Sequence, residues 1–267
     1  MFVFKPTSFN AIRSARTAYL KTTIAALDGM WEDGFFSAAK HWNILLADET
    51  VGYCALDGSN AVLGFQTFDQ GNAGPAFQQC LRELEVSKAF VSTAEPVFLS
   101  LCLDCAGAIK VNALMYEDAG REAEPVEFRD RAEFRLVDAS GFEPAITFGL
   151  AALGCDQAWL EGYYAQRIER NELFGLWDQD HMIAAGELRI SESQAGVADV
   201  GVVVAPEFRR RRLATQILSQ LRSDARARGL RVICSTEREN TSAQAAIVRA
   251  GFQSSHRILE VDLNLTD

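Results

Sequence analysis

Residues 202–218 read VVVAPEFRRRRLATQIL. An apolar run of strand-forming residues ends at Pro206, four arginines follow at 209–212, and a helical pattern begins at about Leu213. A helix start carries unpaired backbone N–H groups and the positive end of the helix dipole, so it attracts anions. Guanidinium groups bind phosphate oxygens as bidentate forks. The stretch therefore predicts a strand–loop–helix unit with an anion site, whereas an isolated arginine run would indicate only a solvated basic patch.

The acidity of the rest of the chain limits what the arginines can serve. The 267 residues include 36 Asp and Glu against 26 Lys and Arg, a formal charge of −10. Nucleic acids and anionic membranes need a broad basic face, so we expect neither as a partner. The N-terminus lacks the pattern of a signal peptide, and the apolar stretch 97–109 is too short to span a bilayer.

The cysteines do not form a framework. All six are scattered along the chain, which is typical of a reduced compartment, and we expect a cytoplasmic protein. Cys102 and Cys105 form a CxxC pair, but no second pair and no histidine lies nearby. Two ordinary thiols are favoured over a redox or metal site, and no metal is expected.

The order of predicted elements is similar in the two halves of the chain. Before a charged stretch at 117–133 we expect helices at 7–28, 75–87 and 96–105 and strands at 43–48, 51–57, 60–68, 88–94 and 108–116. After it we expect helices at 158–170, 213–228 and 241–250 and strands at 133–139, 173–179, 183–191, 197–205, 231–237 and 252–263. The segments 91–107 and 234–251 also share Ser-Thr and a terminal Ala-Gly. A duplicated fold and two unrelated halves both remain open, with duplication favoured.

Two segments of the C-terminal half resemble the signature of the GNAT superfamily, the acyl-CoA-dependent N-acyltransferases. The first is Val204-Ala-Pro206 followed by Arg209 through Ala214, and the second is Asn240-Thr-Ser-Ala243 followed by Ala250-Gly-Phe252. The resemblance covers about residues 133 to 263. It implies an α/β fold, a mixed sheet flanked by helices, and with the repeated order it implies two tandem GNAT-like lobes. The expected organisation is a degenerate GNAT-like domain at 1–120, a linker at 121–132 and a GNAT domain at 133–267.

The resemblance also implies a cosubstrate and a reaction. Acetyl-CoA would lie where strand 197–205 parts from strand 231–237, and a neutral amine acceptor would attack its thioester directly. The acceptor would be a primary amine of a small molecule or peptide. The residues implied in acetyl-CoA binding are backbone groups of the strand, the arginine loop with the helix start, and one asparagine: Val202, Val203, Val204, Arg209, Arg210, Arg211, Arg212, Leu213, Ala214, Thr215 and Asn240.

Two positions depart from the family pattern. Arg212 stands where the family has the middle glycine of its loop, and a residue with a Cβ would fit there if its φ were negative. Ile247 stands where many members have a tyrosine that protonates the leaving thiolate. These departures keep open the alternative of a catalytically weak acyl-CoA binder or sensor.

Three carboxylates are candidates for the general base: Glu187, Asp199 and Glu237. Each lies on or beside a strand that should flank the cleft, although such a carboxylate is more often simply solvated. Glu187 is the first choice because its neighbours in a central strand are apolar. Tyr163 and Tyr164 are expected to pack or line the pocket. The loop at 69–77 has no arginine or lysine, so we expect no second cofactor site in the N-terminal half.

Overall fold

The computed structural model describes residues 1–121, 128 and 132–264. The chain divides into two compact units. Unit 1 consists of Met1–Met115, Glu192–Ala195 and Ser254–Asp267, and unit 2 of Tyr116–Ser191 and Gly196–Gln253. Most of the predicted linker, residues 122–127 and 129–131, lies outside the described residues. The units differ from the predicted domains 1–120 and 133–267 at the end of each range: residues 116–120 belong to unit 2, and residues 254–267, together with 192–195, belong to unit 1.

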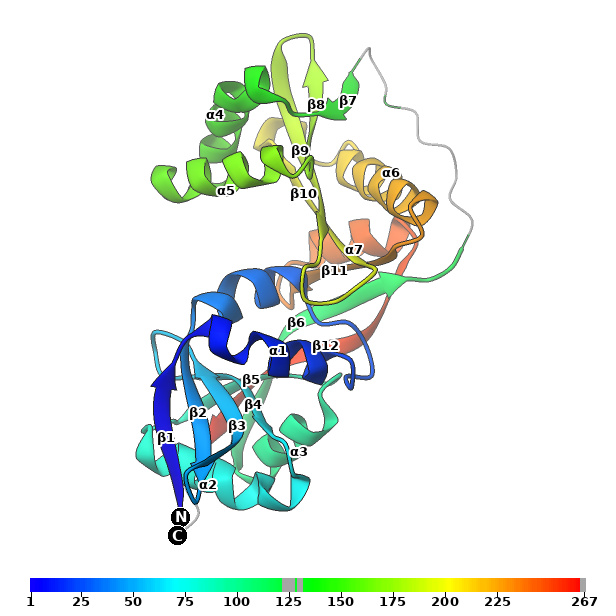
Figure 1. Ribbon diagram of the computed structural model, residues 1–267. Helices are drawn as coiled ribbons and strands as arrows, with labels where there is room; N and C mark the ends of the chain where they lie inside the picture. The colour runs from blue at the N-terminus through cyan, green and yellow to red at the C-terminus, as the bar shows by residue number, and fades with distance from the viewer. Residues whose placement is uncertain (122–127, 129–131, 265–267) are drawn as a thin grey trace. The chain divides into compact units, whose positions relative to one another are not determined.

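Unit 1 is a mixed sheet with helices on both faces (Figure 1). Its strands follow the order β1-β2-β3-β4-β5-β12-β6. They are β1 (Phe2–Thr7), β2 (Lys40–Leu46), β3 (Glu49–Leu56), β4 (Val62–Thr67), β5 (Lys88–Ser92), β12 (Phe252–Leu263) and β6 (Ala106–Asp118). Its helices are α1 (Phe9–Leu20), the π-helical turn η1 (Trp31–Phe36), the short η2 (Gln70–Asn72), α2 (Ala73–Glu83) and α3 (Pro96–Asp104).

The side chains of strand β3 alternate between the two faces of this sheet and show which helices cover each face. Cys54 and Leu56 belong to the core cluster that contains Phe77 and Phe98 from α2 and α3. Tyr53 and Ala55 point the other way, into a cluster with Ile12 of α1 and Phe36 of η1. Because successive side chains of a strand face opposite sides, helices α2 and α3 cover one face and α1 with η1 the other.

Strand β1 is the element of unit 1 that the sequence analysis missed. It pairs antiparallel with β2 from Phe2 to Thr7 and stands first in the strand order. Pro6 lies inside this strand. Because proline has no backbone N–H, it cannot donate a hydrogen bond to a neighbouring strand, so it does not suit a strand that is paired on both sides. An edge strand tolerates this residue, which is why the proline did not prevent a strand here. The expected helix at 7–28 is shorter and ends at Leu20.

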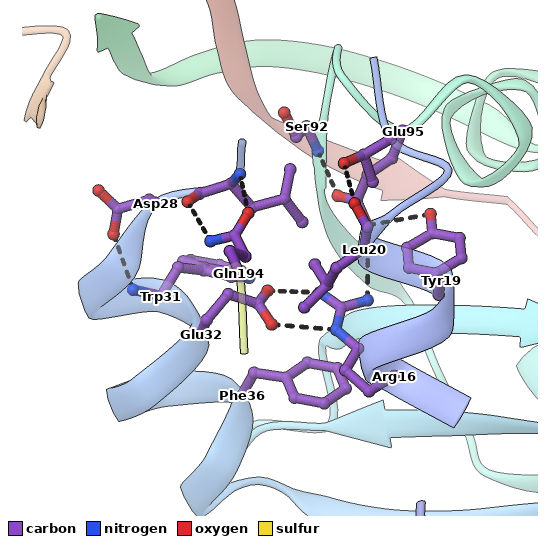
Figure 2. Close-up of polar contacts among 12 residues, drawn as sticks. Arg16, Tyr19, Leu20, Asp28, Trp31, Glu32, Phe36, Ser92, Glu95 and Gln194 are labelled. Atoms are coloured by element: carbon purple, nitrogen blue, oxygen red, sulfur yellow. Dashed lines mark hydrogen bonds and ion pairs between the residues drawn. The ribbon is translucent and has the colours of Figure 1, made fainter. Parts of the chain in front are cut away.

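Buried charges hold α1 and η1 together beneath this face (Figure 2). Arg16 donates from Nε to Glu32 at 3.0 Å and forms a second bond to the same carboxylate. Glu95 accepts from the Tyr19 hydroxyl at 3.1 Å and from the Ser92 backbone N–H at 3.1 Å. Burial raises the pKa of Glu95, and the nearby Arg16 charge offsets only part of that rise. This cluster carries two carboxylates for one arginine.

The side chain of a glutamine also binds in this region. Gln194 Nε2 donates to Leu27 O at 2.8 Å, and Leu27 N donates to Gln194 Oε1 at 2.7 Å. The side-chain amide therefore bonds to the main chain of Leu27 in the way that a neighbouring strand would. This pair of bonds fixes the segment between α1 and η1.

Unit 2 has the sheet order β6-β11-β10-β9-β8-β7, to which β6 contributes its last residues. Its other strands are β7 (Glu133–Leu136), β8 (Leu173–Asp178), β9 (His181–Ile190), β10 (Val197–Val204) and β11 (Arg231–Glu237). Its helices are α4 (Phe142–Leu153), α5 (Gln157–Glu169), α6 (Leu213–Ala227) and α7 (Thr241–Arg249), with short helical turns η3 (Ala139–Gly141) and η4 (Pro206–Phe208). The element order repeats that of unit 1, as the sequence predicted.

Helices α4 and α5 lie on one side of strands β8–β10 and α6 on the other, as Figure 1 shows. Ala185 of β9 packs in a cluster with Leu160 and Tyr164 of α5. A Cβ on the next residue, Gly186, would meet Ile217 of α6 at 2.7 Å. The bare glycine thus lets α6 approach the sheet closely.

Helix α4 was not expected from the sequence. Its side chains are apolar on nearly every side. At most two of them are polar, too few to show the polar face of an amphipathic helix in the sequence. Its end carried a signal, because Gly154 adopts φ 63 at the position after the helix. The described helices contain no segment long and apolar enough to cross a membrane.

Candidate functional site

Strands β10 and β11 part in the middle of unit 2. Their parallel pairing covers Val197↔Arg231 to Asp199↔Ile233, and β10 continues beyond it to Val204 paired only with β9. The backbone of β10 after Asp199 therefore has one side that faces no neighbouring strand. The separation that the sequence analysis expected at this place is confirmed.

A cleft of about 1210 Å³ opens where the strands part. Ten of the eleven residues predicted to bind the cosubstrate line it: Val202, Val203, Val204, Arg209, Arg210, Arg212, Leu213, Ala214, Thr215 and Asn240. Other lining residues come from the end of α4, from β11 and from α7, among them Leu153, Cys234, Ser235, Thr236 and Arg249. The sequence motifs did not include these five residues. Cys234, Ser235 and Thr236 could have been found, since they follow the paired part of β11.

The arginine loop folds tightly before α6. Arg210 has φ 63 and Arg212 has φ 66, so both adopt the left-handed conformation that glycine adopts most easily. The expectation that Arg212 fits through a negative φ is therefore wrong; its backbone adopts the left-handed conformation in spite of the strain. Helix α6 has no side-chain cap, and the N–H groups of its first turn are available to a ligand.

The four arginines of the loop do not share one environment. Arg209, Arg210 and Arg212 line the cleft, and Arg209 Nε donates to Val204 O at 3.2 Å. The Arg211 guanidinium lies instead over the Phe208 ring, 4.9 Å from its centroid, and is not among the lining residues described. Three arginines and a helix start at one wall can hold the oxygens of a phosphate or diphosphate.

Asn240 begins α7 and lines the cleft with its neighbours. Its Oδ1 accepts from the Ala243 N–H at 3.1 Å, the bond of an N-cap residue. The Asn-x-x-Ala spacing is therefore first a helix cap, and the Nδ2 group is the part left to meet a ligand. Ile247, one of the lining residues, is buried and offers no proton donor.

Two of the three candidate bases meet around one buried arginine. Arg189 donates to Glu187 Oε2 at 2.5 Å and to Asp199 Oδ2 at 2.9 Å. The Tyr163 hydroxyl donates to Glu187 at 2.5 Å and accepts from Arg189 at 3.2 Å. Burial disfavours the Arg189 cation, but the charges of Asp199 and Glu187 outweigh it and raise its pKa. Burial and the Glu187 charge also raise the pKa of Tyr163, so this hydroxyl stays a donor.

The strand register explains this grouping. Glu187 pairs with Gly201 and Arg189 pairs with Asp199, so all four residues share one face of β9 and β10. A Cβ on Gly201 would lie 3.3 Å from Arg189 Nη1, and the glycine thus leaves room for the guanidinium. The i, i+2 spacing of Glu187 and Arg189 could have revealed the pair in the sequence. Gly201 directly precedes Val202 of the cleft wall.

Glu237 does not join this group. It is exposed at the end of β11, and its backbone oxygen accepts from Gln244 at 3.2 Å. Within the described part of the chain, the cleft lining contains none of the three candidate carboxylates. Glu187 is the nearest to it along the strand register, because its cross-strand partner is next to Val202. No group of His, Cys, Asp and Glu side chains in the described ranges could hold a metal ion.

The corresponding strand and helix of unit 1 carry buried aromatic rings. Strands β4 and β5 are also parallel, and their pairing consists of Val62↔Ala89. The ring of Phe77 lies 5.0 Å from Phe65 and 6.1 Å from Phe98, and all three are buried. The loop before α2 is held by Asp69, which accepts from Gly71 N at 3.0 Å. These residues supply no cation for a phosphate.

Comparison with known families places both halves in one group. A family model described as "Acetyltransferase (GNAT) domain" matches residues 8–119. A second, described as "Acetyltransferase (GNAT) family", matches residues 146–252. No protein of curated function matches the chain.

Solved structures agree over the whole length. An acetyltransferase from the GNAT family of Colwellia psychrerythraea is 34% identical, with a TM-score of 0.89, and the match covers 99% of this chain and 100% of that one. A GCN5-related N-acetyltransferase from Sphaerobacter thermophilus is 15% identical with a TM-score of 0.66, over 99% and 98% of the two chains. A tandem GNAT protein from the clavulanic acid biosynthesis pathway is 14% identical with a TM-score of 0.67, over 100% of both chains. The last two show the tandem fold alone.

Proposed function

The chain belongs to the GNAT acetyltransferase family, as a tandem of two GNAT domains, and on this premise we propose that it transfers an acetyl group from acetyl-CoA to a primary amine of a small molecule or peptide. The observation that carries the proposal is the cleft of unit 2, in which a splayed strand, a helix start and three arginines meet. The cytoplasm is the proposed location. The proposed partners are acetyl-CoA and the amine.

The proposed binding mode follows from the groups in the cleft. The diphosphate of acetyl-CoA lies against the N–H groups of Leu213, Ala214 and Thr215 and the nearby arginines. The pantetheine arm follows the unpaired side of Val202–Val204 and meets Asn240. A backbone N–H of this strand polarises the thioester carbonyl as its oxygen gains charge.

The reaction needs a neutral amine, and Glu187 is the proposed base. The ammonium group of the acceptor gives a proton to the Glu187 carboxylate, and the free amine attacks the thioester carbon. The tetrahedral adduct then expels the CoA thiolate and leaves an amide. Tyr163 and Arg189 hold the carboxylate in one position through their hydrogen bonds. Ile247 has no acidic proton, so water carries the proton that the amide nitrogen loses to the thiolate, and CoA leaves as the free thiol.

Turnover of a panel of amines, followed by the release of free CoA thiol, tests this proposal. Glu187→Gln should lower kcat by roughly 10²- to 10⁴-fold, the usual contribution of a general base, and leave the dissociation constant of acetyl-CoA unchanged. Asp178→Asn, an exposed carboxylate at the end of β8, is the control and should keep full activity. An unchanged kcat in Glu187→Gln would reject Glu187 as the base.

The alternative is a catalytically weak acyl-CoA binder, and the buried Ile247 in the cleft favours it. Such a protein binds acetyl-CoA but releases no thiol with any amine of the panel. Calorimetry and the turnover assay on the same preparation separate the two.

A further inference from the structure

Asp199 is the more deeply buried of the two carboxylates that meet Arg189. Its side chain is 2% exposed, whereas that of Glu187 is 11% exposed. Asp199 also lies in the part of β10 that is paired on both sides, next to Arg189 of β9 and Ile233 of β11, before the strands separate. A general base must reach the proton that it accepts. The position of Asp199 therefore does not suit a base, and its contact with Arg189 indicates another role.

The two terminal nitrogens of Arg189 have different partners. Nη1 donates to Glu187 Oε2 at 2.5 Å and to the Tyr163 hydroxyl at 3.2 Å, whereas Nη2 donates to Asp199 Oδ2 at 2.9 Å. An arginine and a carboxylate often form two parallel hydrogen bonds instead, with one nitrogen on each oxygen. Because Asp199 binds Nη2, Glu187 receives one bond from this guanidinium and not two.

Both hydrogen bonds of the Glu187 carboxylate end on the same oxygen. Tyr163 and Arg189 donate to Oε2, and within the described ranges no donor binds Oε1. An ionised carboxylate oxygen without a donor keeps its lone pairs for an incoming proton. Oε1 is therefore the atom of Glu187 that can accept a proton from the acceptor amine.

Few charges act on the Glu187 carboxylate. The ionisable side chains that face it among the described residues come from β9, β10 and α5: Arg189, Asp199, Tyr163 and Tyr164. Burial raises the pKa of both tyrosines, so their hydroxyls stay protonated at neutral pH. Strand β8 places the apolar Leu173 opposite Glu187, and Arg167 of α5 pairs with Glu172 at 2.8 Å. The nearest charges are therefore one cation and one anion.

We propose that Asp199 is a positioning residue for the proton transfer: it binds the second nitrogen of Arg189 and so keeps Glu187 Oε1 open to the amine. This inference rests on the proposed function, because it concerns the proposed base. Without the Asp199 charge, Arg189 turns both nitrogens toward Glu187 and closes Oε1 in a two-bond fork. Gly201 leaves room for this movement, because a Cβ there would lie 3.3 Å from Arg189 Nη1.

Two other roles of Asp199 lead to different results. If Asp199 were itself the base, its loss would remove the acidic limb of the pH profile altogether. If it only paired the charge of a buried arginine, its loss would lower the stability of the fold and leave the pH dependence of turnover in place.

The test is the pH profile of kcat/KM on the full chain, with the most rapidly acetylated amine of the panel. Asp199→Asn keeps the shape of the side chain and one acceptor oxygen but removes the charge. Its acidic limb should move to lower pH by roughly one unit, because Arg189, no longer shared, favours the ionised form of Glu187. Its kcat should fall about ten- to a hundredfold, the usual effect of one charge-assisted hydrogen bond that must break. The dissociation constant of acetyl-CoA should not change.

Two further variants complete the experiment. Arg189→Gln removes the cation, so its acidic limb should move to higher pH, in the direction opposite to that of Asp199→Asn. This variant also decides the question if Asp199→Asn does not fold. Asp178→Asn makes the same substitution at the exposed end of β8 and should keep the wild-type profile.

An acidic limb of Asp199→Asn at the wild-type pH would overturn the inference, as would the complete loss of that limb. A limb of Arg189→Gln that stays in place or moves to lower pH would also overturn it. Each of these results leaves acetyl transfer itself in place. No turnover of any amine, or an unchanged kcat in Glu187→Gln, would instead overturn the proposed function or its base, and this inference with it.

Discussion

The guanidinium group of Arg222 occupies the space that a side chain at residue 251 would need. Arg222 Nη1 donates to Gly251 O at 3.0 Å and to Asp118 Oδ1 at 3.1 Å. Gly251 itself adopts φ 94, and a Cβ built on it would overlap the same guanidinium. Two independent reasons therefore require glycine at this position, the backbone conformation and the buried arginine.

Gly251→Ala should lower the free energy of unfolding of the chain by about 3 kcal/mol or more, because it adds left-handed strain and displaces a buried, paired arginine. Gly229→Ala is the control: Gly229 has φ 70 but no atom within 4 Å of its Cβ position. It should cost only about 1 kcal/mol, the conformational part alone. Urea unfolding followed by circular dichroism measures both, and equal losses would contradict the role given to Arg222.

Arg212 should contain strain that glycine relieves. Arg212→Gly and Arg212→Ala both remove the charge, but only alanine keeps a Cβ at φ 66. We expect the glycine variant to be more stable than the alanine variant by about 1 kcal/mol, the cost of a Cβ in the left-handed region. Thermal denaturation of the pair measures the difference. Identical melting temperatures would mean that the loop relaxes to another conformation.

Arg209 and Arg211 should contribute unequally to acetyl-CoA binding. Arg209 lines the cleft, whereas the Arg211 guanidinium lies over Phe208. Arg209→Ala should weaken binding about ten- to a hundredfold at low salt, as expected for a lost charge-assisted contact. Arg211→Ala should change the dissociation constant less than about threefold, a minor electrostatic effect. Calorimetry at two salt concentrations measures both variants, and a larger loss in Arg211→Ala would reverse the assignment.

The buried Glu95 should make unit 1 less stable as the pH rises. Burial raises its pKa above the ordinary value of 4.5, so the folded state binds this proton more tightly than the unfolded state. The free energy of unfolding therefore falls as the pH rises from about 4.5 through the folded pKa. Glu95→Gln lacks this proton, and its stability relative to the wild type should increase across the same range. Urea titrations at a series of pH values test this; a difference that does not change with pH would contradict it.

Helices and strands of both units could be predicted from the sequence where their apolar residues recur with a clear period. The helix at 213–228 and the strands at 183–191 and 197–205 match α6, β9 and β10 closely. Strand β1 and helix α4 were missed for opposite reasons. One contains a proline that only an edge position permits, and the other is too uniformly apolar to show a period.

The candidate site divides in the same way. Most of the residues predicted to bind the cosubstrate are close together in the sequence, because a loop and the helix that follows it are necessarily neighbours. Ten of the eleven predicted residues line one cleft. Arg189 and Arg249 belong to other elements and reach their places through strand register and helix packing. A single sequence does not encode that register in a readable form. Their charges are visible in the sequence, but the elements that pack beside them are not.

The route of the chain has a practical consequence for anyone who wishes to study one half alone. Residues 258–262 of β12 pair with β5 in unit 1, while Asp118 at the end of β6 is the partner of the buried Arg222 in unit 2. A cut between residues 121 and 132 thus gives a front fragment whose β5 has an unpaired edge, a template for aggregation. The rear fragment retains a buried arginine without its carboxylate. Neither piece should be soluble by itself, and only co-expression should restore both, so gene fragments of this protein should be made as complementing pairs.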